Sequence, residues 1–332
     1  MLTAPGDLDE RALGALLGRV WGIGVTGMTY RPVGWGSHHW EVTGGDRRWF
    51  VTVDELEKKR VTGRESLDGG FARLRASLRS AVELARAERD FVVAPVMARG
   101  PVVAGEPVVR LGERFAVAVY PFVEGRSFDW GELDDPGQRL AVLAMVTAVH
   151  TAPGHVLRHA FAEDFSVPFR DELEAACGGE VAGSGPYAEP VAALARECAG
   201  PIRRLLERYD ELVSTARSLS GREVLTHGEP HPGNTMLAED WGWLLIDWDT
   251  ALIAPPERDL WGLDPGDGSV IDAYAAATGV TPVPELLELY RLGWDIKDIA
   301  VDVSRFRRPH AGTAEDDKSW ELMSRLIRHV SG

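Results

Sequence analysis

Short runs of alternating apolar and polar residues fill roughly the first 120 positions of this 332-residue chain. Each run is bounded by glycine or polar turn residues, a pattern typical of strands that bury one face. Residues 70–89 differ, because alanine and leucine recur there at helical spacing. The pattern therefore predicts several strands and one helix. The predicted strands are residues 28–33, 40–43, 48–53, 91–96 and 114–120.

After Gly125 the apolar positions follow a helical period almost to the end of the chain. Strands followed by helices are typical of an α+β protein, here with a boundary near Val123. The predicted helices of this second part are residues 136–150, 168–176, 187–218, 284–306 and 315–330.

Length and composition set the class of protein. A chain of 332 residues with 45% apolar side chains can build two cores. No apolar run approaches the roughly 18 residues that a membrane-spanning helix needs, and the first residues lack a secretory signal. Two cysteines do not form a disulfide framework. We therefore expect a cytoplasmic protein that is not bound to a membrane.

The charge balance changes the expected partners. The chain has 36 basic and 51 acidic side chains, a net charge of −15. Such an excess disfavours nucleic acid and anionic membranes and favours a cationic partner. Solubility alone is the more ordinary explanation of this charge.

The richest chemistry lies in two neighbouring segments, LTHGEPHPGN at residues 225–234 and WLLIDWD at residues 243–249. Glu229 precedes Asn234 by five positions, and Asn234 precedes Asp247 by thirteen. Phosphoryl transfer needs a carboxylate at the acceptor hydroxyl and oxygen ligands for Mg²⁺ beside the phosphates. The spacing predicts that Glu229 is the catalytic carboxylate and that Asn234 and Asp247 bind Mg²⁺.

Zinc is the main competing chemistry, because His227, Glu229 and His231 alternate. A zinc protease places both histidines on one helical face, whereas Pro230 and Pro232 force an extended or turn conformation here. The deaminase signature also fails, since both cysteines lie upstream of the motif. Phosphoryl transfer remains the better interpretation.

These residues resemble the aminoglycoside phosphotransferase family, whose usual pattern is H-G-D-x-x-x-x-N followed by I-D-[WFL]. The run APPERDL at residues 254–260 resembles spectinomycin phosphotransferases in particular. The resemblance implies a bilobal, protein-kinase-like α+β fold. Residues 1–123 would form a nucleotide-binding lobe with a small antiparallel sheet and a helix, and residues 124–332 a larger, mainly helical catalytic and substrate-binding lobe. It also implies transfer of a phosphoryl group from ATP, with GTP not excluded, to a hydroxyl in the presence of Mg²⁺.

Two segments are candidates for nucleotide contact. Gly34, Gly36 and Ser37 lie in a turn between strands, where missing β-carbons let backbone N–H groups approach phosphate oxygens. An ordinary hairpin turn has the same appearance. The segment that ends at Gly125 falls where the resemblance places a kinase hinge, with Pro121 supplying the carbonyl and Val123 the amide for adenine. A buried edge strand is an equal alternative.

The chain departs from the family pattern at two positions. Thr52 stands where the third strand usually carries a lysine that reaches the α- and β-phosphates. Lys58, Lys59 and Arg60 follow this strand, and a surface role is expected for all three. Glu229 replaces the usual aspartate, which lengthens the side chain by one carbon–carbon bond.

The resemblance also gives supporting roles. His227 is expected to support the catalytic loop rather than abstract a proton, through a hydrogen bond to a neighbouring backbone or to Asp247. Asp259 would brace the loop, or alternatively cap the following helix at its N-terminus. Asp249 is a less certain member of the site. His150 matches a recurrent family position, but a hydrogen-bonded core histidine is the simpler explanation.

Acidic residues of the C-terminal part could hold a cationic aminocyclitol or amino sugar. Trp294, Asp295 and Asp298 share approximate helical spacing, so an aromatic wall could lie beside two carboxylates. Most such residues are solvated or packed against a core. Three functions follow: an O-phosphotransferase that confers antibiotic resistance, with spectinomycin as the leading substrate; a metabolite kinase of the choline, homoserine or methylthioribose type; and a nucleotide-binding module without turnover.

Overall fold

The computed structural model describes residues 1, 3–131, 133–219 and 221–331. These residues group into two compact units, each formed by segments distant in sequence. This grouping does not test the expected division between residues 123 and 124, which stays a prediction. The first unit comprises Met1–Arg60, Glu65–Glu163 and Arg222–Pro282, and the second comprises Val61–Arg64, Asp164–Gly221 and Val283–Gly332.

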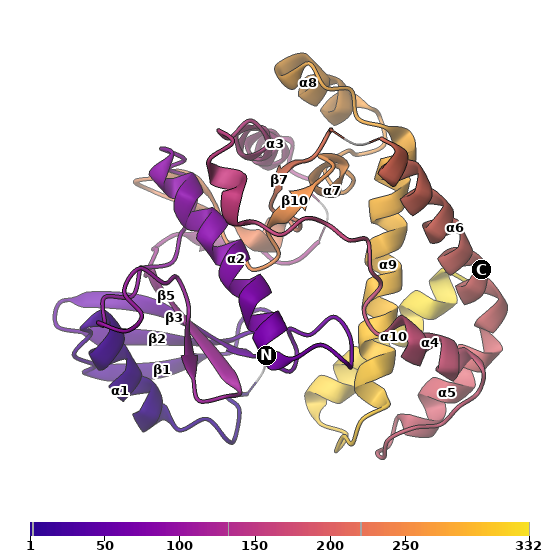
Figure 1. The fold of residues 1–332 in the computed structure, drawn as a ribbon, viewed down its shortest axis with the longest axis horizontal. Helices are drawn as coiled ribbons and strands as arrows, with labels where there is room; N and C mark the ends of the chain where they lie inside the picture. The colour runs from indigo at the N-terminus through magenta and orange to yellow at the C-terminus, as the bar shows by residue number, and fades with distance from the viewer. Residues whose placement is uncertain (2, 132, 220, 332) are drawn as a thin grey trace. The chain divides into compact units, whose positions relative to one another are not determined.

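An antiparallel sheet forms one part of the first unit, as expected (Figure 1). Its strands lie in the order β1, β2, β3, β5, β4. The strands span Gly27–Arg31 in β1, His38–Gly44 in β2, Arg47–Glu55 in β3, Val109–Leu111 in β4 and Phe115–Pro121 in β5.

The two faces of β3 have different roles. Val51 and Val53 are fully buried in a core that helix α1, Glu10–Trp21, completes. Because side chains alternate along a strand, Thr52 and Asp54 lie on the opposite face. The sequence prediction omitted α1, although its N-terminus carries a capping aspartate and its leucines recur at helical spacing.

Helix α2, Leu67–Arg86, agrees with the helix predicted at residues 70–89. The strand predicted at residues 91–96 is wrong, because this segment makes only an isolated bridge, Val92 to Leu245. The amide of Val96 turns to a different partner, the carbonyl of Val119, and Pro95 has no amide hydrogen to offer. Because the backbone hydrogen bonds of this segment go to two different partners, no continuous strand pairing can form.

The rest of the first unit carries the catalytic motif on short strands. Helix α3 spans Pro136–His150, as predicted. Strand β7, Val224–Thr226, pairs with β10, Leu252–Ala254, and β8 pairs with both β6 and β9. The remaining elements are β6, Arg126–Ser127; the 3₁₀ turns Val156–His159 and Pro232–Asn234; β8, Thr235–Ala238; β9, Gly242–Leu245; α7, Glu257–Leu260; and α8, Ser269–Thr278.

The second unit is helical, with a core of its own. The helix predicted at residues 187–218 is wrong as a single element, because it is broken at Cys198. Pro201 cannot donate a backbone hydrogen bond to the carbonyl of Glu197, so the helix cannot continue through this point. The helices are α4, Arg170–Cys177; α5, Ala188–Glu197; α6, Ala199–Ser218; α9, Pro284–Phe306; and α10, Ala314–His329.

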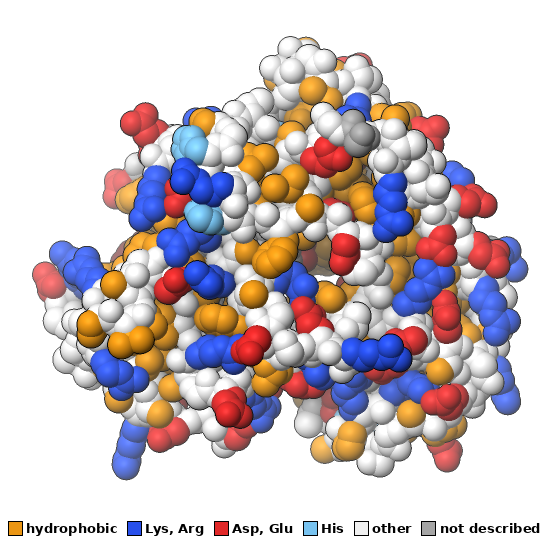
Figure 2. Space-filling view, in the orientation of Figure 1, with side chains coloured by type: hydrophobic (Ala, Val, Ile, Leu, Met, Phe, Trp, Pro, Cys, Tyr) orange, Lys and Arg blue, Asp and Glu red, His pale blue; other side chains and the backbone are white. Residues whose placement is uncertain are grey.

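Across the described residues, none of the helices combines the length and apolarity that crossing a bilayer requires. Acidic and basic side chains alternate over the face shown in Figure 2, without one field of a single sign.

Candidate active site

His227 sits at the start of the catalytic loop and ties that loop to the strand before Asp247. Its buried ring donates from Nε2 to the carbonyl of Ile246 at 2.8 Å and accepts from the amide of Glu229 at Nδ1 at 3.2 Å. Burial lowers the pKa of His227, which agrees with a neutral ring used at both nitrogens. These contacts agree with the expected hydrogen bond to a neighbouring backbone, and the supporting role of His227 in the reaction stays a prediction.

Asp259 holds the same loop through hydrogen bonds to its backbone amides. Its carboxylate accepts the amides of His227 at 2.8 Å and Gly228 at 2.6 Å, and His150 approaches Oδ2 at 3.1 Å. Although burial opposes it, the hydrogen bond from His150 lowers the pKa of Asp259. The N-cap alternative is wrong, because Asp259 lies inside α7. The expectation of a hydrogen-bonded core histidine agrees with the placement of His150.

Gly228 allows a sharp bend between His227 and Glu229. Its φ is +103°, and a β-carbon there would meet the guanidinium of Arg258. Arg258 donates to Oγ1 of Thr226 at 2.8 Å and to the carbonyl of Thr250 at 3.0 Å. The bend and the arginine together hold β7 and the segment after Asp247 in register.

Asn234 and Asp247 are brought together by neighbouring antiparallel strands. The amide of Ile246 donates to the carbonyl of Asn234 at 2.9 Å, which places Asn234 opposite the residue before Asp247. The side-chain Nδ2 of Asn234 donates to the carbonyl of Glu229 at 2.9 Å. Asn234 is thus hydrogen-bonded to the backbone of Glu229 and to the backbone of the residue before Asp247, within the first unit.

The donor set at this point fits a hard divalent cation. Because Nδ2 of Asn234 is already used, its amide oxygen remains as an acceptor, and the carboxylate of Asp247 follows the residue that pairs with Asn234. In the described part of the chain, no three His, Cys, Asp or Glu side chains gather as a metal-binding group. Mg²⁺ commonly takes one or two protein oxygens and completes its coordination with phosphate and water. The pair therefore suits Mg²⁺ held jointly with a nucleotide.

The electrostatics of the site also favour a cation. Desolvation and then the charges of Asp249 and Glu229 raise the pKa of Asp247 well above its usual value, although Asp247 keeps exposed surface. Desolvation, reinforced by Asp249, raises the pKa of Glu229 to about 7. A bound divalent cation would stabilise both ionised forms.

Lys59 corrects the expectation of a surface role for the cations after β3. Its ammonium lies 2.6 Å from Oδ2 of Asp249 and 2.9 Å from Oδ1 of Asp54, and its side chain is 17% exposed. Lys58 behaves as expected, since it is 46% exposed and pairs with Glu55 at 2.6 Å. A lysine-poor chain with two lysines after the third strand was the available signal, but sequence could not say which one turns inward.

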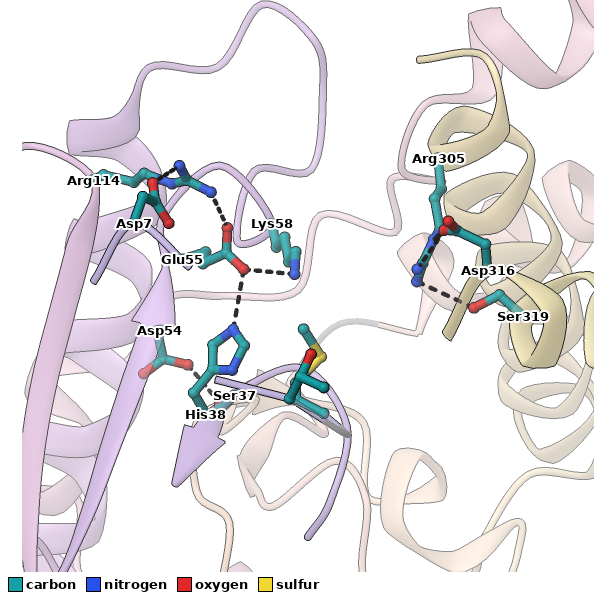
Figure 3. A network of polar contacts seen from close by, with 12 residues as sticks. Asp7, Ser37, His38, Asp54, Glu55, Lys58, Arg114, Arg305, Asp316 and Ser319 are labelled. Atoms are coloured by element: carbon teal, nitrogen blue, oxygen red, sulfur yellow. Dashed lines mark hydrogen bonds and ion pairs between the residues drawn. The ribbon is translucent and has the colours of Figure 1, made fainter. Parts of the chain in front are cut away.

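The predicted nucleotide-covering turn contacts Asp54, the residue that also pairs with Lys59. Gly34 and Gly36 adopt φ of +65° and +86°, which suits a tight turn. Figure 3 shows the buried Ser37 hydroxyl pointing at Asp54, to which it donates at 2.5 Å. Their contact with phosphate stays a prediction.

The other predicted site residues lie on separate elements. Pro121 ends β5, and Val123 lies in the connection to β6. Trp294, Asp295 and Asp298 lie on α9 of the second unit, where burial raises the pKa of Asp295. Their roles toward adenine and the acceptor stay predictions.

Comparison with known sequences gives a family and a curated relative. A sequence model described as the phosphotransferase enzyme family matches residues 29–295. Protein StrN of Streptomyces griseus is 31% identical over 282 residues, which cover 82% of this chain and 82% of that protein.

Solved structures share the fold at low sequence identity. Spectinomycin phosphotransferase APH(9)-Ia, in complex with ADP and spectinomycin, matches with a TM-score of 0.68 and 17% identity over 96% of this chain and 97% of its own. Choline kinase LicA from Streptococcus pneumoniae matches with a TM-score of 0.57 and 10% identity over 96% and 99% of the two chains.

Proposed function

We propose, because this chain belongs to the phosphotransferase enzyme family, that it transfers the γ-phosphoryl group of ATP to a hydroxyl of an aminocyclitol or aminoglycoside antibiotic. Spectinomycin is the leading substrate, and the activity would confer resistance to it. The observation that carries the proposal is the joint anchoring of Glu229, Asn234 and Asp247 through His227 and the β8–β9 pairing.

The mechanism assigns one step to each group. Glu229 accepts a hydrogen bond from the acceptor hydroxyl, aims its oxygen at the γ-phosphorus and takes the proton as the new P–O bond forms. The bond between the γ-phosphorus and the β,γ-bridging oxygen breaks, and ADP leaves with that electron pair. In a loose transition state the carboxylate acts mainly by orienting the hydroxyl, so glutamate can replace aspartate if the loop holds it correctly.

Asn234 and Asp247 would hold Mg²⁺ through an amide and a carboxylate oxygen. The bound ion would neutralise charge on the β- and γ-phosphates as the leaving oxygen develops it. His227 and Asp259 act indirectly, since their hydrogen bonds fix the backbone on which these side chains stand.

Two observations support an antibiotic acceptor. The solved relative APH(9)-Ia is a spectinomycin phosphotransferase, and it aligns over almost the whole chain. The sequence run at residues 254–260 is the one that resembles this group. Carboxylates on α9, including Asp295 and Asp298, would receive the amino groups of the acceptor beside Trp294.

Substrate-dependent turnover tests the proposal. Purified protein should be incubated with Mg-ATP and each member of a panel of aminocyclitols, aminoglycosides, choline, homoserine and methylthioribose. We expect spectinomycin to gain the mass of one phosphoryl group and to release ADP in equal amount. Phosphorylation of choline, homoserine or methylthioribose alone would favour the metabolite-kinase alternative. The fold shared with choline kinase LicA is the observation that supports this alternative. Nucleotide binding without any transfer would favour the nucleotide-binding module without turnover. Thr52, in place of the usual strand lysine, is the observation that supports this module.

A further inference from the structure

Strand β3 carries Thr52 at the position where related kinases have the lysine that contacts the nucleotide phosphates. Thr52 occupies the central position, paired with His39 on one side and Ala118 on the other. A hydroxyl can donate one hydrogen bond but brings no charge to the α- and β-phosphates of a nucleotide. Another cation must supply this charge if the site uses ATP.

The structure offers a replacement on the same face of the strand. Asp54 follows Thr52 by two positions, so both side chains leave β3 on the face opposite the core. The ammonium of Lys59 is held at Asp54, five residues further along, where the chain folds back after the strand. We propose that Lys59 is the lysine that contacts the nucleotide phosphates, in place of the missing strand lysine.

The surroundings of Lys59 support this assignment. Its second partner is Asp249, two residues after the proposed metal ligand Asp247. The ammonium is therefore fixed beside the place where Mg²⁺ and phosphate would meet. Lys58, the adjacent residue, is turned away to Glu55, which also contacts His38 and Arg114 (Figure 3).

Several carboxylates surround the ammonium of Lys59, and their charge bears on its role. Lys59 forms ion pairs with Asp54 and Asp249, and both Lys59 and Arg258 act electrostatically on Glu229. A nucleotide would bring further negative charge, so the phosphates need an ammonium held in place, and lysine binds phosphate as a compact point charge. The carboxylates of this cluster are Asp54, Glu229, Asp247 and Asp249.

Asp54 takes on two further tasks in this arrangement. In kinases a helix glutamate usually holds the strand lysine. Here the partner comes from the end of β3 itself, and the same carboxylate accepts the Ser37 hydroxyl of the turn at Gly34 and Gly36. Lys59, Asp54 and Ser37 thus connect the turn to the segment that carries Asp249.

Nucleotide affinity in the absence of an acceptor tests the assignment, which rests on the proposed nucleotide-dependent reaction. We expect Lys59→Met to weaken binding of Mg-ADP, measured by isothermal titration below the melting temperature, about tenfold or more, the equivalent of about 1.4 kcal/mol. Lys58→Met, the matched control, should bind as the wild type does. Adding Thr52→Lys to Lys59→Met should restore much of the affinity, because the new ammonium would leave the strand on the correct face.

A measurement on the wild-type chain keeps the test independent of folding in the variants. The sequence has four lysines, at positions 58, 59, 297 and 318, so ¹³Cε-lysine labelling gives a simple spectrum. Mg-ADP should shift the Lys59 resonance and leave that of Lys58 in place.

An unshifted Lys59 resonance in nucleotide-saturated protein, or wild-type affinity in Lys59→Met, would overturn the assignment. Failure of Thr52→Lys to restore affinity in a folded double variant would also count against it, because a purely structural ion pair predicts that result. A protein that binds nucleotide through Lys59 but phosphorylates no aminocyclitol would instead contradict only the proposed acceptor.

Discussion

At the scale of single residues, the geometry of the site depends on which polar groups already form hydrogen bonds within the protein. His227 uses both ring nitrogens, and Asn234 uses its amide nitrogen, so neither side chain can turn freely. Glu229 and Asp247 carry the carboxylates to which we assign the acceptor hydroxyl and Mg²⁺. In the proposed mechanism Glu229 acts on the acceptor hydroxyl, and Asp247 holds Mg²⁺ together with the amide oxygen of Asn234.

Asp247 tests the metal assignment. Asp247→Asn keeps the shape of the side chain, and asparagine tolerates the positive φ of +63° at this position. We expect the variant to melt near the wild-type temperature and to lose about 10³-fold or more in turnover, because a charged Mg²⁺ ligand is gone. ADP release with saturating acceptor measures this loss. Turnover close to that of the wild type would remove Asp247 from the metal site.

Glu229 tests the role of the catalytic carboxylate. Glu229→Gln keeps a hydrogen-bond acceptor at the same length but removes the charge that orients and deprotonates the hydroxyl. We expect turnover to fall about 10²-fold or more, while affinity for Mg-ADP changes little. Steady-state kinetics together with nucleotide titration separate the two effects. An equal loss in both would assign Glu229 to nucleotide binding instead.

At the scale of elements, local signals predicted most helices and strands but not their interruptions. Pro136 and Pro284 mark the first residues of helices whose bounds agree with the prediction. The break at Cys198 was missed, although Pro201 in the first turn of α6 was the available signal for it. The inward turn of Lys59 was missed for a different reason: its carboxylate partner Asp249 lies 190 residues away in the chain. Periodicity carries no information about such a pairing.

Helix α9 contains a partly buried carboxyl group, Asp302, whose ionisation is expected to lower the stability of the protein. Burial raises the pKa of Asp302 to about 6, only partly opposed by Arg305. A carboxyl group with a raised folded-state pKa lowers stability as pH rises from the unfolded value, and the full cost is present above pH 6. Asp302→Asn should therefore raise the free energy of unfolding by about 1–3 kcal/mol at pH 7, with little gain at pH 4. Urea unfolding at both pH values measures this. An equal gain at both would show that ionisation is not the cause.

At the scale of the whole molecule, the catalytic motif, Lys59 and the antiparallel sheet all belong to one compact unit. The sequence motif identified the reaction class because its residues are close in the chain and meet through neighbouring strands. The acceptor is harder to predict, since it depends on side chains of helices such as α9 whose spacing is equally compatible with packing.

The central claim is that Asn234 and Asp247 hold a divalent ion beside Glu229. A crystal structure with Mn²⁺, a non-hydrolysable ATP analogue and spectinomycin tests it most directly, because anomalous scattering locates the ion. We predict Mn²⁺ about 2.1 Å from oxygens of Asn234 and Asp247, with the Glu229 carboxylate at hydrogen-bond distance from a spectinomycin hydroxyl. An ion bound at other residues, or an acceptor hydroxyl out of reach of Glu229, would contradict the account.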